Sequence, residues 1–524
     1  MSKSRLSALQ KMPLRPSWIR KWTIWCWKTT SALGRTMTRL PINSILSYSM
    51  SEKTTLIKNA DYVITMNDNR EILENTSLLI SGNRIVECPT QVTEADEIID
   101  ATHKLVFPGF VNTHHHFFQT GFRFVPEMQS APLGQWVKIL GERSKNFNEQ
   151  DWYNCSATSL AELVLSGCTT TADHCYLIPH DRNDFFDQEV RAAKDLGVRF
   201  HPVRGSMTLS ANEGTIFPPH ICQSLDMVIR EIQRVIDTHH DPSSDSMCHV
   251  AAGPCFPVFP VSSSEEEMKE VMRLCRVNGV RMHTHAAEEI DEFDYTVQKT
   301  GKTPIGYLES IGCLGQDVWL AHCIFLTRRD IEILAATNTA IASCPSANSR
   351  GAGIAKVTEY LQAGIPVGVG VDGAAGNDTS NIQSELRMLR TLQGAREGVL
   401  NSYLIDQDPK TRCTIAAELK GTSYLNIDRL FEVGTLHGAK ALGRENVIGS
   451  LEAGKLADIA IFDDHAISHA GAFFRPGSLF SCSPLRAWHV MINGKTVVMN
   501  GELRTADEET IISNQQRTTE KLRK

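Results

Sequence analysis

The chain has 524 residues, more than the roughly 250–300 residues that one hydrophobic core normally serves unless the fold is a barrel with additions. A hydrophobic content of 42% and a charged content of 22% are ordinary for a globular protein. The net charge of −7 makes nucleic acid an unexpected partner, and without a run of about 18 apolar residues no membrane span is expected. The 14 cysteines are scattered without a CxxC pair, which indicates reduced thiols of an intracellular protein and not a disulfide framework.

The first 49 residues differ from the rest of the chain. They contain nine Lys or Arg, no Asp or Glu, and four of the eight tryptophans. A basic, acid-free leader of this kind resembles an organelle transit peptide, although translation could equally begin at Met50. We therefore predict that residues 1–50 are a poorly ordered extension without a catalytic role. The protein is expected in the cytoplasm, or in mitochondria if residues 1–49 are a genuine transit peptide.

Short strand patterns occur at both ends of the remaining chain. Near the start, apolar runs flank a Gly82-Asn83 turn, and near the end a run over residues 457–462 precedes a second hairpin with Asn493-Gly494 at its turn. We predict a small β-sandwich domain built from both termini, over residues 51–106 and 447–510, followed by a C-terminal tail at 511–524.

The middle of the chain alternates strands with amphipathic helices, among them residues 265–278 and 327–336. Eight candidate strands begin at Phe107, Thr169, Arg199, His249, Arg281, Val318, Thr339 and Pro366. This pattern predicts an α/β fold, a (β/α)₈ TIM-like barrel over residues 107–446. In such a barrel the active-site residues lie at the carboxyl ends of the strands.

Metal-competent side chains follow several of these strands. The segment Pro108-Gly109-Phe110-Val111-Asn112-Thr113-His114-His115-His116 places His114 and His116 on one side of an extended chain. Two neighbouring imidazoles are half of a metal site. Three further apolar runs end at His285, His322 and Asp372. A buried parallel strand has no structural need for such an ending, so the coincidence predicts one shared site.

These motifs resemble the amidohydrolase superfamily, in particular its mononuclear, cytosine-deaminase-like branch. The matching pieces are PGFVNTHHH, HTHAAEE, AHC after VWL, VGVGVDGAAGND and LEAGKLADIAIFD. Within the branch, HHHFFQTGFR, LSGCTTTADHCYLIP, VRGSM and CPSANSRGAGIAKV are most similar to 8-oxoguanine deaminases and s-triazine hydrolases. The resemblance covers residues 53 to 500.

The resemblance implies that His114, His116, His285 and Asp372 bind one divalent metal, zinc first, with iron(II) as the alternative. Three nitrogens and one carboxylate suit either ion and leave a position for water. The fourth strand, from His249 to Cys255, has no lysine that could bridge two metals, which favours one.

The resemblance also gives Glu288 and His322 acid/base and orienting roles. The expected reaction is hydrolytic displacement at an electron-poor ring carbon, with water activated by the metal. Asp372 and His322 accept the proton of that water, and Glu288 protonates a ring nitrogen and then the departing amine. Weaker candidates for substrate contacts are Gln119, Trp136, Arg204, His174 and Asn348.

The first hypothesis is therefore a deaminase of a small N-heterocycle, with 8-oxoguanine or a related purine as the substrate. The alternative is an s-triazine dechlorinase or N-dealkylating hydrolase, which would use the same hydrolytic displacement but expel another leaving group. A non-catalytic scaffold relative is the alternative of another class, although such proteins usually lose metal ligands. The only partner expected beyond the heterocyclic substrate is a second copy of the chain, because relatives are commonly homo-oligomers.

Overall fold

The computed structural model describes residues 52–523 except 216, 257–261, 405–407 and 412–424. The predicted N-terminal extension lies outside the described residues. Within the described part of the chain, no helix is both long and apolar enough to cross a membrane.

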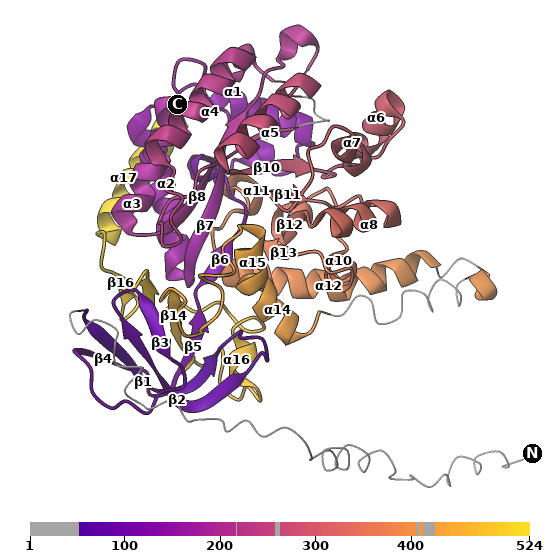
Figure 1. The fold of residues 1–524 in the computed structure, drawn as a ribbon. Coiled ribbons are helices and arrows are strands. Elements are labelled where there is room, and N and C mark those ends of the chain that lie inside the picture. The colour runs from indigo at the N-terminus through magenta and orange to yellow at the C-terminus, as the bar shows by residue number, and fades with distance from the viewer. Residues whose placement is uncertain (1–51, 216, 257–261, 405–407, 412–424, 524) are drawn as a thin grey trace, which may run out of the picture. The chain divides into compact units, whose positions relative to one another are not determined.

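Eight parallel strands close into a barrel within the described residues (Figure 1). The barrel closes where β13 pairs with β6, with Val369 opposite Asn112. The predicted (β/α)₈ architecture is confirmed. The strands of the barrel are β6 (Phe110–Asn112), β7 (Cys168–Cys175), β8 (Arg199–Ser206), β9 (Ala251–Pro254), β10 (Arg281–Ala286), β11 (Val318–His322), β12 (Ala340–Ser343) and β13 (Val367–Val369).

Helices alternate with the barrel strands, and α5 (Glu265–Asn278) shows why they form where the sequence predicts. The Ser264 side chain accepts from the backbone N–H of Glu267 at the N-terminus, and Gly279 ends the helix with a left-handed φ of 66°. The other helices of these units are α2 (Glu149–Leu165), α3 (Asp184–Leu196), α4 (Leu225–His239), α6 (Ile290–Thr300), α7 (Pro304–Ser310), α8 (Arg328–Thr337), α10 (Val357–Gln362) and α12 (Ile382–Leu404).

The remaining helical elements are mostly short. They are η2 (Phe117–Phe122), η3 (Pro126–Met128), α1 (Leu133–Ser144), η4 (Ala211–Glu213), η5 (Pro219–Ile221), α9 (Pro345–Asn348), α11 (Ala374–Asn377), α14 (Ile427–Gly434), α15 (Leu436–Ala441), α16 (Arg475–Ser478) and α17 (Glu508–Leu522).

A second, mixed sheet combines strands from both ends of the described chain. It runs β17-β16-β15-β14-β5-β1-β2-β3, with β4 paired to β1. The predicted hairpins are present, with Ser81 opposite Arg84 and Ile492 opposite Lys495. Its strands are β1 (Thr54–Ile64), β2 (Ile72–Ser81), β3 (Arg84–Glu87), β4 (Glu97–Asp100), β5 (Lys104–Pro108), β14 (Ile459–Asp463), β15 (His489–Ile492), β16 (Lys495–Met499) and β17 (Glu502–Leu503).

The apolar run that the sequence analysis assigned to the first barrel strand is divided between the two sheets. Phe107 belongs to β5, which pairs with β14, and the barrel strand begins only at Phe110. Gly109 separates them, and a Cβ there would lie 2.1 Å from the Thr169 side chain. The chain crosses from one sheet to the other at this residue, and only glycine fits the close contact made there.

The segment predicted as a C-terminal tail is part of a docked helix. Helix α17 packs on α2, where Lys521 pairs with Asp151 and Thr518 donates to the same carboxylate at 3.1 Å. Leu522 is buried and belongs to the main core. Its Cδ1 would lie 2.9 Å from a Cβ at Gly121, so the end of α17 contacts the turn η2 that follows His116.

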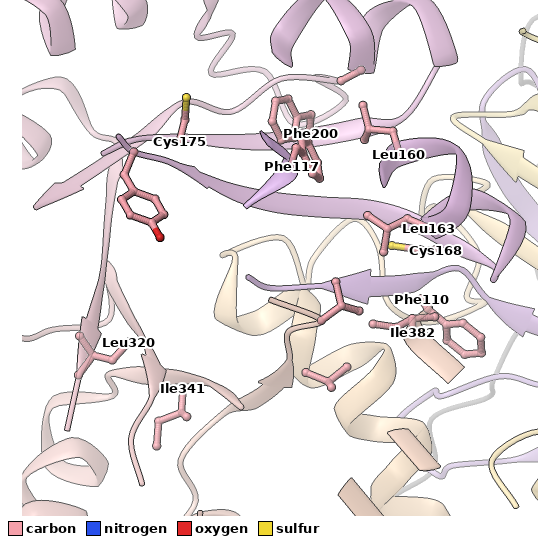
Figure 2. Packing of buried hydrophobic residues seen from close by; sticks show 14 of the residues in the cluster. Phe110, Phe117, Leu160, Leu163, Cys168, Cys175, Phe200, Leu320, Ile341 and Ile382 are labelled. Atoms are coloured by element: carbon pink, nitrogen blue, oxygen red, sulfur yellow. The ribbon is translucent and has the colours of Figure 1, made fainter. Parts of the chain in front are cut away.

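One continuous hydrophobic core fills the space between the barrel strands and the surrounding helices. Figure 2 shows Phe117 against Phe200 in this core, where the rings stack with centroids 5.5 Å apart. The two sheets are also joined by a buried ion pair, in which Arg199 of β8 donates to Asp458 at 2.8 Å. Asp458 accepts from the backbone N–H of Asn493 as well, so its charge is well satisfied.

Candidate active site

The polar residues singled out in the sequence gather at the carboxyl ends of the barrel strands. His114 and His116 follow β6, His285 lies near the end of β10, and His322 ends β11. Asp372 follows β13. His322 and Asp372 have φ of 68° and 61°, a left-handed conformation that turns the chain abruptly at the strand end. Such strained backbone is concentrated at functional sites.

Four potential ligand atoms converge at these ends. The Nε2 atoms of His116 and His285 lie 3.2 Å apart. Oδ1 of Asp372 lies 3.4 Å from Nε2 of His116 and 3.5 Å from Nε2 of His114. The three imidazoles are buried, and the Asp372 side chain is 13% exposed. The structure thus brings together the four residues that the sequence predicted as metal ligands.

The backbone sets the protonation of two of these imidazoles. Nδ1 of His116 lies 2.8 Å from the carbonyl oxygen of His174, and Nδ1 of His285 lies 2.8 Å from that of Cys255. A carbonyl oxygen only accepts, so both Nδ1 atoms carry the proton. Each Nε2 is therefore left with a lone pair.

A third histidine sets the protonation of His114. Nδ1 of His283 donates to the carbonyl oxygen of Trp319 at 2.8 Å, so Nε2 of His283 accepts from Nδ1 of His114 at 2.7 Å. Nε2 of His114 then has a lone pair, and it has no hydrogen-bond partner among the described residues. His283 thus orients a candidate ligand.

This arrangement fits a divalent cation. Three lone pairs and a carboxylate face one another with no hydrogen between them, which is unfavourable unless a positive charge lies among them. Two ligands held about 2.0–2.1 Å from a tetrahedral zinc ion are about 3.3–3.4 Å apart. The observed separations of 3.2, 3.4 and 3.5 Å match that spacing.

Glu288 and His322 form an acid–base pair beside these ligands. Oε1 of Glu288 lies 3.6 Å from Nε2 of His322, whose Nδ1 donates to Oδ1 of Asn348 at 2.8 Å. Burial raises the pKa of Glu288 to about 7. The pKa of His322 is raised despite burial, which alone would lower it, because the charges of Glu288 and Asp372 favour the imidazolium. Both groups are therefore suited to proton transfer near neutral pH.

A cavity of about 470 Å³ opens over this cluster. Gln119 and Trp136 line it, as the sequence predicted for substrate contacts. A Cβ on Gly373 would lie 2.0 Å from Oε1 of Gln119, so the bare backbone there leaves room for the amide. The charged or ionisable lining residues are His116, His285, Glu288, Glu289, Asp291, His322, Arg350 and Asp372.

Three predicted substrate contacts lie outside the described lining of this cavity. Arg204 is buried and donates to Asn183 at 3.0 Å and to Gln223 at 2.8 Å. His174 supports His116 through its backbone carbonyl, and Asn348 supports His322. None of these three side chains lines the cavity as the structure describes it.

Two aromatic residues of the cavity were missed by the sequence analysis. The Tyr176 ring lies 4.6 Å from that of His116, and Phe256 stacks on His285 with centroids 4.8 Å apart. Tyr176 lies two residues beyond His174 at the end of β7, so the period of two along a strand would have indicated it. Phe256 follows β9 in a segment without a comparable signal.

A closed barrel with histidines and carboxylates at the carboxyl ends of its strands is the architecture of a (β/α)₈-barrel enzyme. The model of the Amidohydrolase family matches residues 105–501. The chain belongs to the amidohydrolase family and is a hydrolase that acts on carbon–nitrogen bonds.

Similar proteins agree with this assignment. The chain is 33% identical over 443 residues to 8-oxoguanine deaminase of Pseudomonas aeruginosa, covering 83% of this chain and 92% of that protein. It is 34% identical over 421 residues to hydroxydechloroatrazine ethylaminohydrolase of Pseudomonas sp. strain ADP, covering 79% and 82%. The solved structure of atrazine chlorohydrolase from Arthrobacter aurescens TC1, complexed with zinc, superposes with a TM-score of 0.80 at 29% identity, covering 89% and 100%.

Proposed function

We propose that the chain is a metal-dependent aminohydrolase that attacks a ring carbon of a small planar N-heterocycle and releases ammonia. 8-Oxoguanine or a related purine is the first substrate. The observation that carries the proposal is the partly buried carboxyl of Glu288, which lies 3.6 Å from Nε2 of His322 at the edge of the ligand cluster and whose pKa burial raises to about 7. A departing amine must receive a proton, and this carboxyl is placed to donate it.

His114, His116, His285 and Asp372 would hold one divalent ion, zinc first. When bound, such an ion supplies a nucleophilic water at neutral pH. The zinc present in the structure of the Arthrobacter relative supports the choice of metal. The tautomers that the chain imposes on the three histidines keep their Nε2 atoms free for this purpose.

Proton transfer falls to three side chains in this proposal. Asp372 and His322 orient the attacking water and accept its proton, since Nδ1 of His322 is engaged by Asn348 and its Nε2 is free to accept. Glu288 gives its proton to the ring nitrogen next to the attacked carbon. The carboxylate so formed takes up the proton that His322 accepted from water, across their 3.6 Å contact, and passes it to the amine, which leaves as ammonia. The second proton of the water, released from the new oxygen of the product, restores the acid form of Glu288. General acid–base assistance of this kind contributes about 10²–10⁴-fold to the rate.

The cavity supports a flat substrate. Phe256 and Trp136 present aromatic faces, and the amide of Gln119 offers a donor and an acceptor for a ring N–H or an oxo group. The relationship to 8-oxoguanine deaminase favours a purine. The 34% identity to an s-triazine ethylaminohydrolase supports a second candidate, in which an alkylamine leaves in place of ammonia.

A substrate panel tests the proposal. Zinc-loaded protein is assayed with 8-oxoguanine, guanine, cytosine and hydroxyatrazine, with ammonia and alkylamine release measured separately. A kcat/KM for 8-oxoguanine at least tenfold above the others supports the first candidate. Turnover of hydroxyatrazine alone would move the assignment to the s-triazine hydrolases. If protein with a full equivalent of zinc turned over none of these substrates, the non-catalytic scaffold would be the remaining interpretation.

A further inference from the structure

We propose that His174, Cys255 and His285 form a second, off-centre position for a soft divalent cation, such as Cd²⁺ or excess Zn²⁺, that competes with the proposed metal centre for His285. The inference rests on the proposed function only in that His285 belongs to both positions. We call this second set of three residues the thiol position.

The three side chains come from β7, β9 and β10 of the barrel, with β8 between the first two strands. His174 lies in β7, Cys255 follows β9 directly, and His285 lies in β10. All three are buried, and one potential ligand atom from each lies within 4.8 Å of the other two. Sγ of Cys255 is 4.0 Å from Nδ1 of His285. Ligands of one tetrahedral ion lie about 3.3–3.6 Å apart, so side-chain shifts of about 1 Å bring such a group around one ion.

His174 supplies the observation that points to a ligand. Its Nε2 lies 3.2 Å from the carbonyl oxygen of Gly253, so Nε2 carries the proton and Nδ1 carries a lone pair. That buried Nδ1 has no hydrogen-bond partner in the described part of the chain. A buried acceptor without a partner is unfavourable, and a cation on the Cys255 side satisfies it.

The packing of the strands fixes the position of Gly253, whose carbonyl oxygen sets the tautomer of His174. A Cβ on Gly253 would lie 1.7 Å from the carbonyl oxygen of His283. Only glycine allows β9 and β10 to approach so closely. The Gly253 carbonyl is thereby held against the ring of His174.

His285 can serve only one ion at a time. Its Nδ1 donates to the Cys255 carbonyl, which leaves the Nε2 lone pair as its only ligand. The proposed metal centre uses that lone pair together with His116 and Asp372. Sγ of Cys255 lies beside the other nitrogen, Nδ1, so an ion in the thiol position takes Nδ1 and the proton of that nitrogen moves to Nε2. The proton then blocks the lone pair that the metal centre uses, and excess metal inhibits the enzyme.

The donor set selects soft cations. Thiolate sulfur prefers soft ions, whereas the metal centre offers only nitrogen and oxygen. On binding, the Cys255 S–H bond breaks, the proton passes to buffer, and a sulfur–metal bond forms without any change of oxidation state. Cd²⁺ binds thiolate sulfur more strongly than harder ions do, so it is the preferred occupant of the thiol position.

A spectroscopic titration tests the inference without relying on activity. Metal-free protein is titrated with Cd²⁺, and the ultraviolet charge-transfer absorption of a thiolate–cadmium bond is recorded. We expect this band in the wild type and its loss in Cys255→Ser. The matched control is Cys344→Ser, because Cys344 groups with His322 and Asp372 and is the rival thiol. The band should persist in that variant.

The remaining outcomes are decisive as well. Absence of the band in the wild type, or its persistence in Cys255→Ser, would overturn the thiol position, as would its loss in Cys344→Ser alone. Binding of one zinc equivalent by Cys255→Ser shows that the variant is folded with an intact metal centre. Failure of every variant and the wild type to bind zinc would instead refute the proposed function. In the wild type excess Zn²⁺ should inhibit, and Cys255→Ser should require about tenfold more.

Discussion

His283 is expected to control metal affinity although it is not a proposed ligand. Its Nε2 accepts from Nδ1 of His114 at 2.7 Å within the buried core of the barrel. In His283→Phe the ring still packs on Trp319, with which His283 stacks at 4.4 Å, but the acceptor is gone. His114 is then free to move its proton to Nε2, where it blocks the lone pair that the metal needs.

The size of the effect follows from the role of such orienting partners. Their loss typically weakens metal affinity about 10–100-fold, which corresponds to about 1.4–2.8 kcal/mol at tenfold per 1.4 kcal/mol. Zinc affinity is measured by competition with a chromophoric chelator, with circular dichroism to verify the fold. His283→Gln should recover part of the affinity, because its amide oxygen can accept from His114.

The control removes a buried histidine that has no link to the ligands. His201 lies in β8, is 2% exposed, and packs edge-on against His249, so His201→Phe should leave zinc affinity within about twofold of the wild type. Zinc binding by folded His283→Phe at wild-type affinity would refute the tautomer argument. Equal weakening in His201→Phe would do the same, because the loss would then be a general effect of core mutation.

Three further predictions follow from other contacts. Glu288→Gln should lower kcat by about 10²–10⁴-fold with full zinc content. In the wild type, kcat/KM should fall as pH rises through about 7, because the acid form of Glu288 is the active one. A pH profile that is unchanged in Glu288→Gln would argue against this role. Leu522→Ala should lower the free energy of unfolding, measured in urea, by about 2–3 kcal/mol, because the side chain is buried against η2. The control is Ile512→Ala on the same helix. Ile512 is 47% exposed, so its loss should lower the free energy of unfolding by less than about 0.5 kcal/mol. Asp458→Ala should cost about 3–5 kcal/mol, measured in the same way, since it leaves Arg199 buried without its partner; a loss below 1 kcal/mol would show that the two sheets do not depend on this pair.

Regular patterns in the sequence were sufficient to predict the barrel and the ligand cluster. Helix α5 was predicted with the bounds it has, because Ser264 and Gly279 mark both ends of an amphipathic run. The ligands could be predicted because the carboxyl ends of parallel strands meet at one rim. His114, His285 and Asp372 are far apart in the sequence, yet they converge for this reason.

The substrate contacts were harder to predict because side-chain direction decides them. Arg204 ends a barrel strand as an active-site residue would, but its guanidinium is held by Asn183 and Gln223 away from the cavity. Asn348 has a hydrogen-bonding partner in His322, so it orients a catalytic candidate in place of a substrate. Nothing in the local sequence distinguishes these outcomes, since they depend on loops packed from distant parts of the chain.

The crossover at Gly109 has a consequence for how this protein is made. The strand immediately before the ligand-bearing segment, β5, pairs on one side with β14, whose residues are synthesised some 350 positions later. A nascent chain that has left the ribosome as far as α11 therefore already contains every proposed ligand, yet β5 still has an open edge. An unpaired edge of this kind is a site of misassociation between chains. Premature termination before Ile459 should thus yield aggregates instead of a smaller enzyme.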